Sequence, residues 1–103
     1  MCAKPWELWY AAVRYEDEPT VEDRPVLITS ANKAIIIAFK VTKSEPRNMW
    51  GEYELVMWNS AGLDVPSTVR LTKQINLTSK DMRRRIGVLQ PIDILEIQKM
   101  IGT

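Results

Sequence analysis

Hydrophobic residues concentrate in two short β-branched runs that lie between Arg24 and Thr42. The first run follows Pro25, and the second follows the polar link Ser30-Ala31-Asn32-Lys33, which is typical of a turn. Each run is too short for a helix and is rich in Val and Ile, so the pattern predicts two strands of one antiparallel hairpin. Residues at the start of the first strand then lie opposite residues at the end of the second. We therefore expect Arg24 and Thr42 to be neighbours, and a cation beside a hydroxyl suits a phosphate.

The rest of the chain consists of short alternating or apolar segments separated by turn residues, which favours a β-rich fold. A single helical turn is expected near Lys80. The last segment is the one regular helix that the pattern predicts, beginning at Pro91, with Asp93 early and Lys99 late, as the helix dipole favours. Further strands are expected at 6–15, 51–58, 67–72 and 84–89. Together these elements favour a small, strongly bent antiparallel sheet or barrel, formed by one domain over residues 1–103.

Charge is distributed unevenly along a chain whose net charge is only +1. Acidic residues cluster at 16–23, which predicts an exposed loop that either aids solubility or covers a basic site, whereas cations dominate after the hairpin. The sequence has no histidine, which removes the commonest general base and metal ligand, and its one cysteine, Cys2, cannot form an internal disulfide. No apolar run approaches the roughly 20 residues that span a bilayer, and the first residues lack a signal-peptide pattern. We expect a cytoplasmic protein that does not bind membranes.

Several short motifs, taken in their order and spacing, resemble the PemK/MazF-type toxins of bacterial toxin–antitoxin pairs. They are Asp23-Arg24-Pro25-Val26-Leu27-Ile28, Lys40-Val41-Thr42 followed by Pro46-Arg47, Gly51-Glu52-Tyr53-Glu54, Ala61-Gly62-Leu63, Pro66-Ser67-Thr68-Val69-Arg70-Leu71 and Ile86-Gly87-Val88-Leu89. The resemblance covers nearly the whole chain. It implies a small SH3-like (CcdB/PemK-like) antiparallel barrel with a C-terminal helix.

The same resemblance implies an enzyme, namely a homodimeric and sequence-specific endoribonuclease toxin (mRNA interferase) that cuts single-stranded RNA. Such toxins use no metal and no other cofactor, and they leave a 2′,3′-cyclic phosphate and a 5′-hydroxyl. A cognate antitoxin with an acidic segment is then the expected protein partner, which would bind the basic groove and compete with RNA. Large apolar side chains also favour a homodimer, because a barrel of this size does not readily enclose Trp6, Trp9, Tyr10, Met57 and Trp58.

The resemblance assigns catalytic roles to two residues: Arg24 stabilises the charge of the phosphate, and Thr42 donates to a phosphate oxygen. The alternative for Arg24 is a surface ion pair with Glu22 or Asp23, and the alternative for Thr42 is an ordinary strand residue. Other residues would bind the RNA or its flanking phosphates, unless they only form a solvated surface. These substrate-binding candidates are Lys40, Lys43, Ser44, Arg47 and Arg70.

One segment departs from the family pattern and leaves the proton acceptor open. Many members have an acidic residue before a Gln and an arginine shortly after it, whereas this chain has Lys73 and Asn76. The base is then Glu22, Glu52 or a hydroxyl, or the mechanism has no strong base. This departure supports one alternative to the nuclease, an inactive relative that binds RNA or a protein partner. A second alternative is a non-enzymatic poison like the CcdB-type proteins that bind DNA gyrase.

Overall fold

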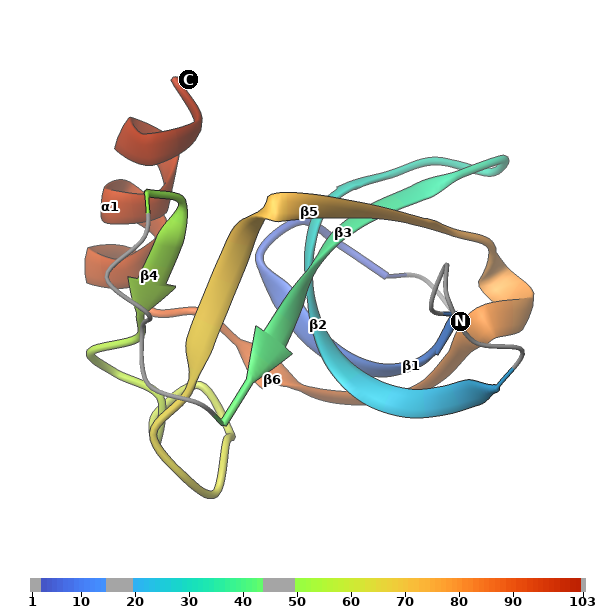
Figure 1. The fold of residues 1–103 in the computed structure, drawn as a ribbon, viewed down its shortest axis with the longest axis horizontal. Coiled ribbons are helices and arrows are strands. Elements are labelled where there is room, and N and C mark those ends of the chain that lie inside the picture. The colour runs from blue at the N-terminus through green and yellow to red at the C-terminus, as the bar shows by residue number, and fades with distance from the viewer. Residues whose placement is uncertain (1–2, 15–19, 44–49, 103) are drawn as a thin grey trace.

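Six strands, a short 3-10 helix and one α-helix make up the fold in the computed structural model, which describes residues 3–14, 20–43 and 50–102 (Figure 1). The elements are β1 (Glu7–Arg14), β2 (Val21–Ala31), β3 (Ile36–Thr42), β4 (Glu52–Glu54), β5 (Thr68–Leu77), η1 (Ser79–Asp81), β6 (Met82–Val88) and α1 (Pro91–Ile101). All strand pairs are antiparallel, in the order β4-β5-β3-β2-β1-β6. The predicted fold class, mainly β and barrel-like with a C-terminal helix, is confirmed. Within the described residues the sheet is not closed, because β4 and β6 remain its two edges.

The predicted hairpin is present as β2 and β3. Val26 pairs with Lys40, and the pairing continues toward the turn with one irregularity after Ile28. β2 extends two residues into the predicted link, so the turn itself starts at Asn32. The Asn32 side-chain oxygen accepts hydrogen bonds from the N–H groups of Ala34 and Ile35, at 2.8 and 2.9 Å. Asparagine suits this position because its side chain imitates a backbone turn.

The prediction of an exposed loop at 16–23 is wrong for residues 21–23. Residues 21–23 belong to β2 and pair with β1, although their side chains are exposed as expected. Hydrophobic periodicity could not reveal this strand, because ladder hydrogen bonds hold it and its side chains bury little surface. Residues 16–19 lie outside the described part of the chain.

Two other strand predictions have the wrong length. The strand expected at 51–58 is reduced to the three residues of β4. The N–H groups of Val56 and Met57 donate to the Asp93 carboxylate of α1 instead of continuing the ladder with β5. The strand expected at 67–72 continues to Leu77 alongside β3.

Both predicted helical segments are confirmed. The turn near Lys80 is η1, where the Asp81 carboxylate accepts the N–H of Thr78 at 2.9 Å. The C-terminal helix begins at Pro91 as expected and ends at Gly102, whose φ of 79° is the left-handed conformation that glycine adopts without strain. In the ranges that the structure describes, no helix has the length and apolarity needed to cross a bilayer.

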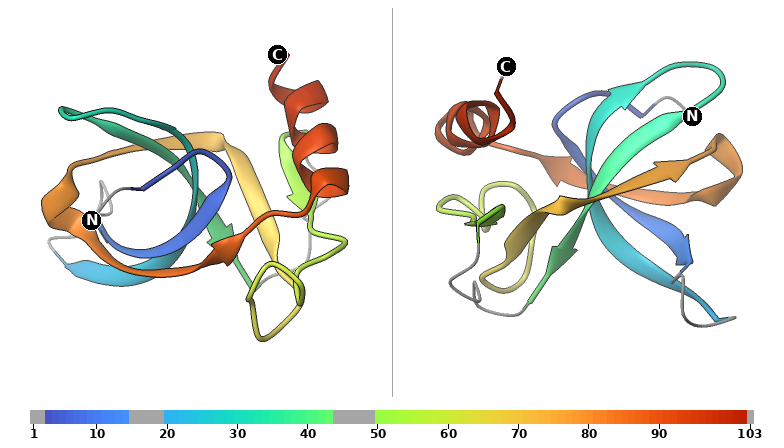
Figure 2. Two further views of the ribbon diagram at one scale, coloured as in Figure 1. Left: turned by 180° about the vertical axis from the view of Figure 1, so that it is seen from behind. Right: turned by 45° about the horizontal axis from the view of Figure 1, so that its top comes forward.

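Buried side chains form two clusters, one on each face of the curved sheet. Leu8 and Leu27 belong to the first cluster, whereas their neighbours Trp9 and Val26 belong to the second, as expected of strands covered on both faces. The first cluster includes Ile97 of α1. Figure 2 shows α1 at one end of the sheet, beside β4. The helix therefore covers the end of the barrel at which the first cluster is buried.

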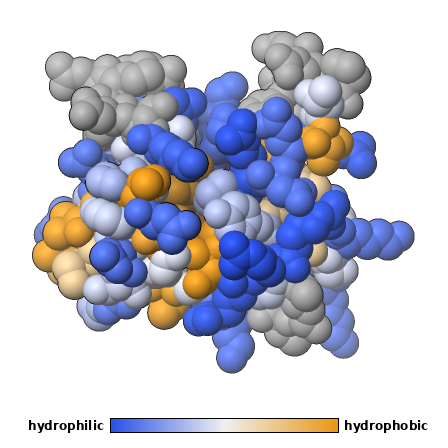
Figure 3. Space-filling view, turned by 90° about the horizontal axis from the view of Figure 1, so that it is seen from below, coloured by the Kyte–Doolittle hydropathy of each residue, from blue (hydrophilic) through white to orange (hydrophobic). Residues whose placement is uncertain are grey.

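The aromatic residues that favoured a homodimer are mostly enclosed by the chain itself. Trp9 is buried, and Trp6 and Trp58 pack against the first cluster. Hydrophobic surface gathers instead on the side where β4 and α1 lie (Figure 3). The exposed hydrophobic residues of the β4–β5 link and of α1 are Val56, Met57, Val65, Ile92 and Leu95. The homodimer stays a prediction, but the physical reason given for it applies only to Met57 among the residues named.

A buried carboxylate in the first turn of α1 fixes the link between β4 and β5. Asp93 is fully buried and accepts three hydrogen bonds: from the Tyr53 hydroxyl at 2.6 Å and from the N–H groups of Val56 and Met57 at 3.0 and 2.9 Å. Burial raises the pKa of Tyr53, and the bond to the Asp93 carboxylate raises it further. The start of the β4–β5 link is thus bound to the helix through one side chain.

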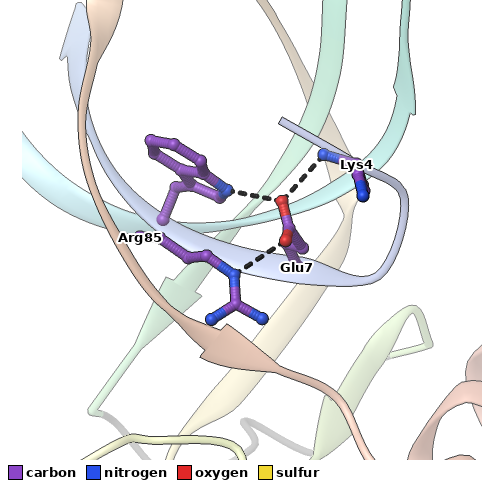
Figure 4. A network of polar contacts seen from close by, with 4 residues as sticks. Lys4, Glu7 and Arg85 are labelled. Carbon is purple, nitrogen blue, oxygen red and sulfur yellow. Dashed lines mark hydrogen bonds and ion pairs between the residues drawn. The ribbon is translucent and has the colours of Figure 1, made fainter. Parts of the chain in front are cut away.

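A second buried carboxylate, Glu7, joins the start of β1 to β6 (Figure 4). It accepts hydrogen bonds from the Lys4 N–H at 2.8 Å, the Trp9 indole N–H at 3.0 Å and the Arg85 Nε at 2.7 Å. Burial by itself would raise the pKa of Glu7, but these bonds outweigh it and hold the pKa below its ordinary value of 4.5.

The lowered pKa of Glu7 predicts how stability changes in acid. A carboxyl with a depressed folded pKa adds stability above its unfolded value, and this stability is lost as the pH falls through the folded value. We expect Glu7→Gln to lose about 1.5–3 kcal/mol of unfolding free energy at pH 7, and the difference from the parental protein to shrink below pH 4.5. Urea unfolding at pH 7 and pH 3.5 measures both values. Equal stability of the two proteins at pH 7 would contradict this assignment.

Candidate functional site

A cavity of about 430 Å³ opens where the first halves of β2 and β5 and the end of β3 meet the β4–β5 link. Its polar lining has four cations, one carboxylate and three hydroxyl groups. The lining residues are Tyr10, Arg24, Pro25, Lys40, Val41, Thr42, Lys43, Leu63, Asp64, Val65, Ser67 and Arg70. Both residues with an expected catalytic role and three of the expected RNA-binding residues therefore meet in one place. Ser44 and Arg47 lie outside the described residues.

Arg24 and Thr42 come together because of the hairpin register. The ladder between β2 and β3 begins at the pair Val26–Lys40, two residues from Arg24 on one strand and two residues from Thr42 on the other, so the register brings both to the same end of the hairpin. On its other side Arg24 pairs with Ala11 of β1. The expectation that a cation and a hydroxyl are neighbours at the hairpin ends thus agrees with the structure, in which both line the cavity.

The Arg24 guanidinium forms an ion pair with Glu22, two residues earlier on β2. Both Nε and Nη2 of Arg24 donate to one carboxylate oxygen of Glu22. The two side chains are 49% and 44% exposed, so water screens the pair and it adds little stability. This is the surface pair foreseen as the alternative for Arg24. It does not remove Arg24 from the cavity, and an anion that binds there competes with Glu22 for the same guanidinium.

Two cations of the cavity face each other across β3 and β5. Lys40 pairs directly with Arg70, and Arg70 pairs on its other side with Glu52 of β4. The Glu52 carboxylate lies 3.8 Å from the Arg70 Nε, and the Glu52 side chain is only 2% exposed. A carboxylate so deeply buried is poorly placed to take a proton from a bound substrate, which argues against Glu52 as the base.

Sequence reasoning missed Tyr10 and Asp64 as cavity residues. The Arg84 guanidinium stacks over the Tyr10 ring at 4.6 Å, so β6 adds a cation beside the cavity. Asp64 is exposed and directly follows the motif residue Leu63, which was the only signal that pointed to it. Among the described residues, it is the one carboxylate that lines the cavity.

The β4–β5 link reaches the cavity because it is held at both ends. Asp93 fixes its start, as described above, and further along it crosses β6 at Gly87. A Cβ on Gly87 would clash with the carbonyl oxygen of Ala61, and Gly62 has a φ of 103°. Both glycines are thus required by close approach or by backbone conformation. The cavity residues from Leu63 to Ser67 follow directly.

β5 bends sharply between its two halves (Figure 1). Phe39 faces Gln74, but the next residue, Lys40, faces Arg70 instead of Lys73, so residues 71–73 form a corner that is left out of the ladder with β3. Of the described residues that line the cavity, none comes from β5 beyond this corner. Lys73 and Asn76, which depart from the family pattern, therefore lie outside the cavity lining. In the part of the chain that the structure describes, no three acidic or cysteine side chains gather as metal ligands would.

No family model matches this sequence, and no curated protein matches it. Solved structures do match. The Mycobacterium tuberculosis toxin MazF-mt6 has a TM-score of 0.75 at 22% identity, over 93% of this chain and 92% of that one. An endoribonuclease in complex with its cognate antitoxin from a mycobacterial species has a TM-score of 0.75 at 16% identity, over 98% and 96%. A further mycobacterial endoribonuclease has a TM-score of 0.71 at 18% identity, over 99% and 94%.

These matches define the class to which the fold belongs. The chain has the fold of the MazF-type toxins, along nearly its full length. The fold implied by the sequence motifs is therefore confirmed.

Proposed function

We propose that this protein is the toxin of a toxin–antitoxin pair, acts in the cytoplasm, and cleaves single-stranded RNA, mRNA included, at specific sequences. One observation carries the proposal. Arg24 and Thr42, from two different strands, line a single cavity together with Lys40, Lys43 and Arg70. The MazF-type fold supports it, since structures of this fold include proteins described as endoribonucleases. A poison that acts only by binding a protein would not need this arrangement of cations and hydroxyls.

The reaction that fits these residues is transphosphorylation. The 2′-hydroxyl oxygen of the RNA attacks the adjacent phosphorus, the bond from phosphorus to O5′ breaks, and the products are a 2′,3′-cyclic phosphate and a 5′-hydroxyl. The nucleophile belongs to the substrate, so the protein has to orient the phosphate and stabilise its added charge. Arg24 does this through a permanently charged planar fork, and Thr42 donates to a non-bridging oxygen.

Two proton transfers accompany this reaction. The 2′-hydroxyl loses a proton, and the leaving 5′-oxygen gains one. Among the described carboxylates, Glu22 contacts Arg24 and Asp64 lines the cavity, and these two are placed best to accept the first proton. The chemistry as proposed uses neither a metal nor another cofactor.

The remaining cations bind the RNA on either side of the scissile phosphate. Lys40, Lys43 and Arg70 contact flanking phosphates, and the proposal extends to Ser44 and Arg47, which follow β3 in the sequence. Such contacts set affinity and its salt dependence rather than the rate of the chemical step.

We also propose a homodimer and a cognate antitoxin. An antitoxin segment that is acidic and partly apolar fits the cationic cavity and excludes RNA from it. One structure of this fold is an endoribonuclease in complex with its cognate antitoxin, which supports such a partner. A monomeric mass at micromolar concentration would count against the dimer, and RNA cleavage unaffected by a bound antitoxin would count against the shared surface.

The proposed function predicts cleavage of long single-stranded RNA in the presence of EDTA, with cyclic phosphate at the new 3′ ends. Gel electrophoresis and mass spectrometry of the fragments test this. Thr42→Val keeps the shape of the side chain and removes its hydroxyl, so we expect the rate to fall about 10²-fold or more. Thr72→Val, the same change at an exposed threonine outside the cavity lining, is the control. RNA that stays intact, or that is cut equally well by Thr42→Val, would favour the inactive RNA-binding alternative.

A further inference from the structure

Arg70 is held in the cavity by a charge behind it rather than by hydrogen bonds. Its Nε is buried and has no hydrogen-bond partner, and the nearest Glu52 oxygen, at 3.8 Å, is too far for a hydrogen bond. The Arg70 side chain is 20% exposed. In the part of the chain that the structure describes, this ion pair is the one interaction of the Arg70 side chain.

The position of Arg70 is otherwise unfavourable. Lys40 lies directly opposite it on β3, and like charges directly opposite each other destabilise a sheet. The sheet row that runs Glu52, Arg70, Lys40 therefore places one buried negative charge behind two positive ones. Both cations line the cavity, whereas Glu52 does not.

We propose that Glu52 is a positioning residue: its buried carboxylate holds the Arg70 guanidinium at the cavity wall, where Arg70 and Lys40 together bind one phosphate of the RNA backbone. This inference rests on the proposed function for its ligand. A guanidinium has five donors in a fixed plane, and a carboxylate hydrogen-bonded to it would compete with a phosphate for the same edge of that plane. A carboxylate at ion-pair distance fixes the charge and leaves the donors for the ligand.

Two possible roles of Glu52 predict opposite effects of removing its charge, so one variant distinguishes them. If Glu52 merely lowered the potential of the cavity, Glu52→Gln would strengthen RNA binding and keep every phosphate contact. If Glu52 positions Arg70, the same variant weakens binding and one phosphate contact is lost. Each contact to single-stranded nucleic acid contributes about 0.7 to the slope of log affinity against log salt concentration.

The probe is single-stranded 2′-O-methyl RNA of mixed sequence, which has no free 2′-hydroxyl and is not cleaved. We expect Glu52→Gln to weaken its binding on the order of 10-fold, the coupling usual for residues in contact, and to flatten the salt slope by about 0.7. In an Arg70→Gln background the Glu52→Gln change should have no further effect. Glu52→Asp keeps the charge and should restore most of the affinity. Glu54→Gln, on the same short strand but exposed and outside the cavity lining, is the matched control.

Each outcome supports or overturns the inference. Equal or tighter binding by Glu52→Gln overturns it, as does an effect that persists in the Arg70→Gln background, since Glu52 would then act on the fold. Thermal unfolding shows whether each variant is folded. If Glu52→Gln does not fold, Glu52→Asp at parental stability is the deciding variant: affinity close to the parental value supports the inference, and a lower affinity like that expected of Glu52→Gln overturns it. A parental protein that binds the probe and responds as expected but never cuts RNA refutes the nuclease and supports the role of Glu52. A parental protein that does not bind the probe overturns both.

Discussion

Arg24→Ala should lose cleavage of single-stranded RNA by about 10²–10³-fold at saturating substrate while the protein stays folded. Removing a preorganised donor to a developing negative charge typically has an effect of this size. The loss should appear in kcat, because the charge that Arg24 stabilises develops in the transition state. The Arg24 side chain is half exposed and its pair with Glu22 is screened, so the unfolding free energy should change by less than about 1 kcal/mol.

Arg83→Ala is the matched control for Arg24→Ala. Arg83 is exposed to a similar extent, at 46%, and it pairs with Asp23, the residue next to Arg24, at 3.4 Å. It does not line the cavity. We expect Arg83→Ala to retain the parental kcat. If Arg24→Ala and Arg83→Ala cut RNA equally well, the site is assigned wrongly.

Asp93→Ala should give the largest loss of stability, about 3–5 kcal/mol. The substitution leaves the Tyr53 hydroxyl and the N–H groups of Val56 and Met57 without the acceptor they share in the parental protein, and buried donors without partners are costly. A domain of this size is typically stable by roughly 5–15 kcal/mol. Denaturant unfolding measures the loss.

Asp93→Asn separates the contribution of shape from that of charge. The amide retains one oxygen acceptor but turns an N–H₂ group toward a backbone donor, so we expect about half the loss of the alanine variant. The control is Glu96→Gln on the exposed side of α1, where the pair with Lys99 is solvated and the expected change is within about 0.5 kcal/mol. A loss for Asp93→Ala no larger than this control would show that the link is held by packing alone.

The Asp93 substitutions also test whether the attachment of the β4–β5 link to α1 matters for the candidate site. The β4–β5 link that Asp93 fixes supplies Leu63, Asp64, Val65 and Ser67 to the cavity. A folded but loosened variant should therefore bind RNA less well. An effect on stability with no effect on RNA binding would mean that Gly62 and Gly87 suffice to place the link.

The sequence predicted the hairpin, the helix and the meeting of Arg24 with Thr42, because each depends on a local pattern. Two runs of β-branched residues define two strands, and the turn between them sets their register. The β4–β5 link could not be predicted in this way. Its course depends on Asp93, which lies far along the chain and in the sequence looks like an ordinary helix-start acid.

Of the cavity, too, local patterns in the sequence predicted only a part. The sequence identified Lys40 and Arg70 as candidate cations for phosphate binding. It could not show that they lie directly opposite each other, because this pairing depends on the corner in β5, which the hydrophobic pattern does not reveal. Glu52 looked like a possible base in the sequence. Its burial behind Arg70 changes that interpretation, and burial of a charge is a property of the assembled sheet rather than of one strand.

The corner in β5 gives the two halves of that strand separate registers, and this bears on how the sequence can drift. Before the corner, β5 is fixed between β4 and the end of β3; beyond it, the strand pairs again with β3 from Gln74 onward. A slip of register moves every side chain of a regular strand to the opposite face, but a corner that lies outside the ladder with β3 absorbs an added or lost position. The corner at 71–73 can therefore gain, lose or exchange residues without displacing Arg70. Chains with this fold can therefore differ at the corner while retaining the same cavity lining.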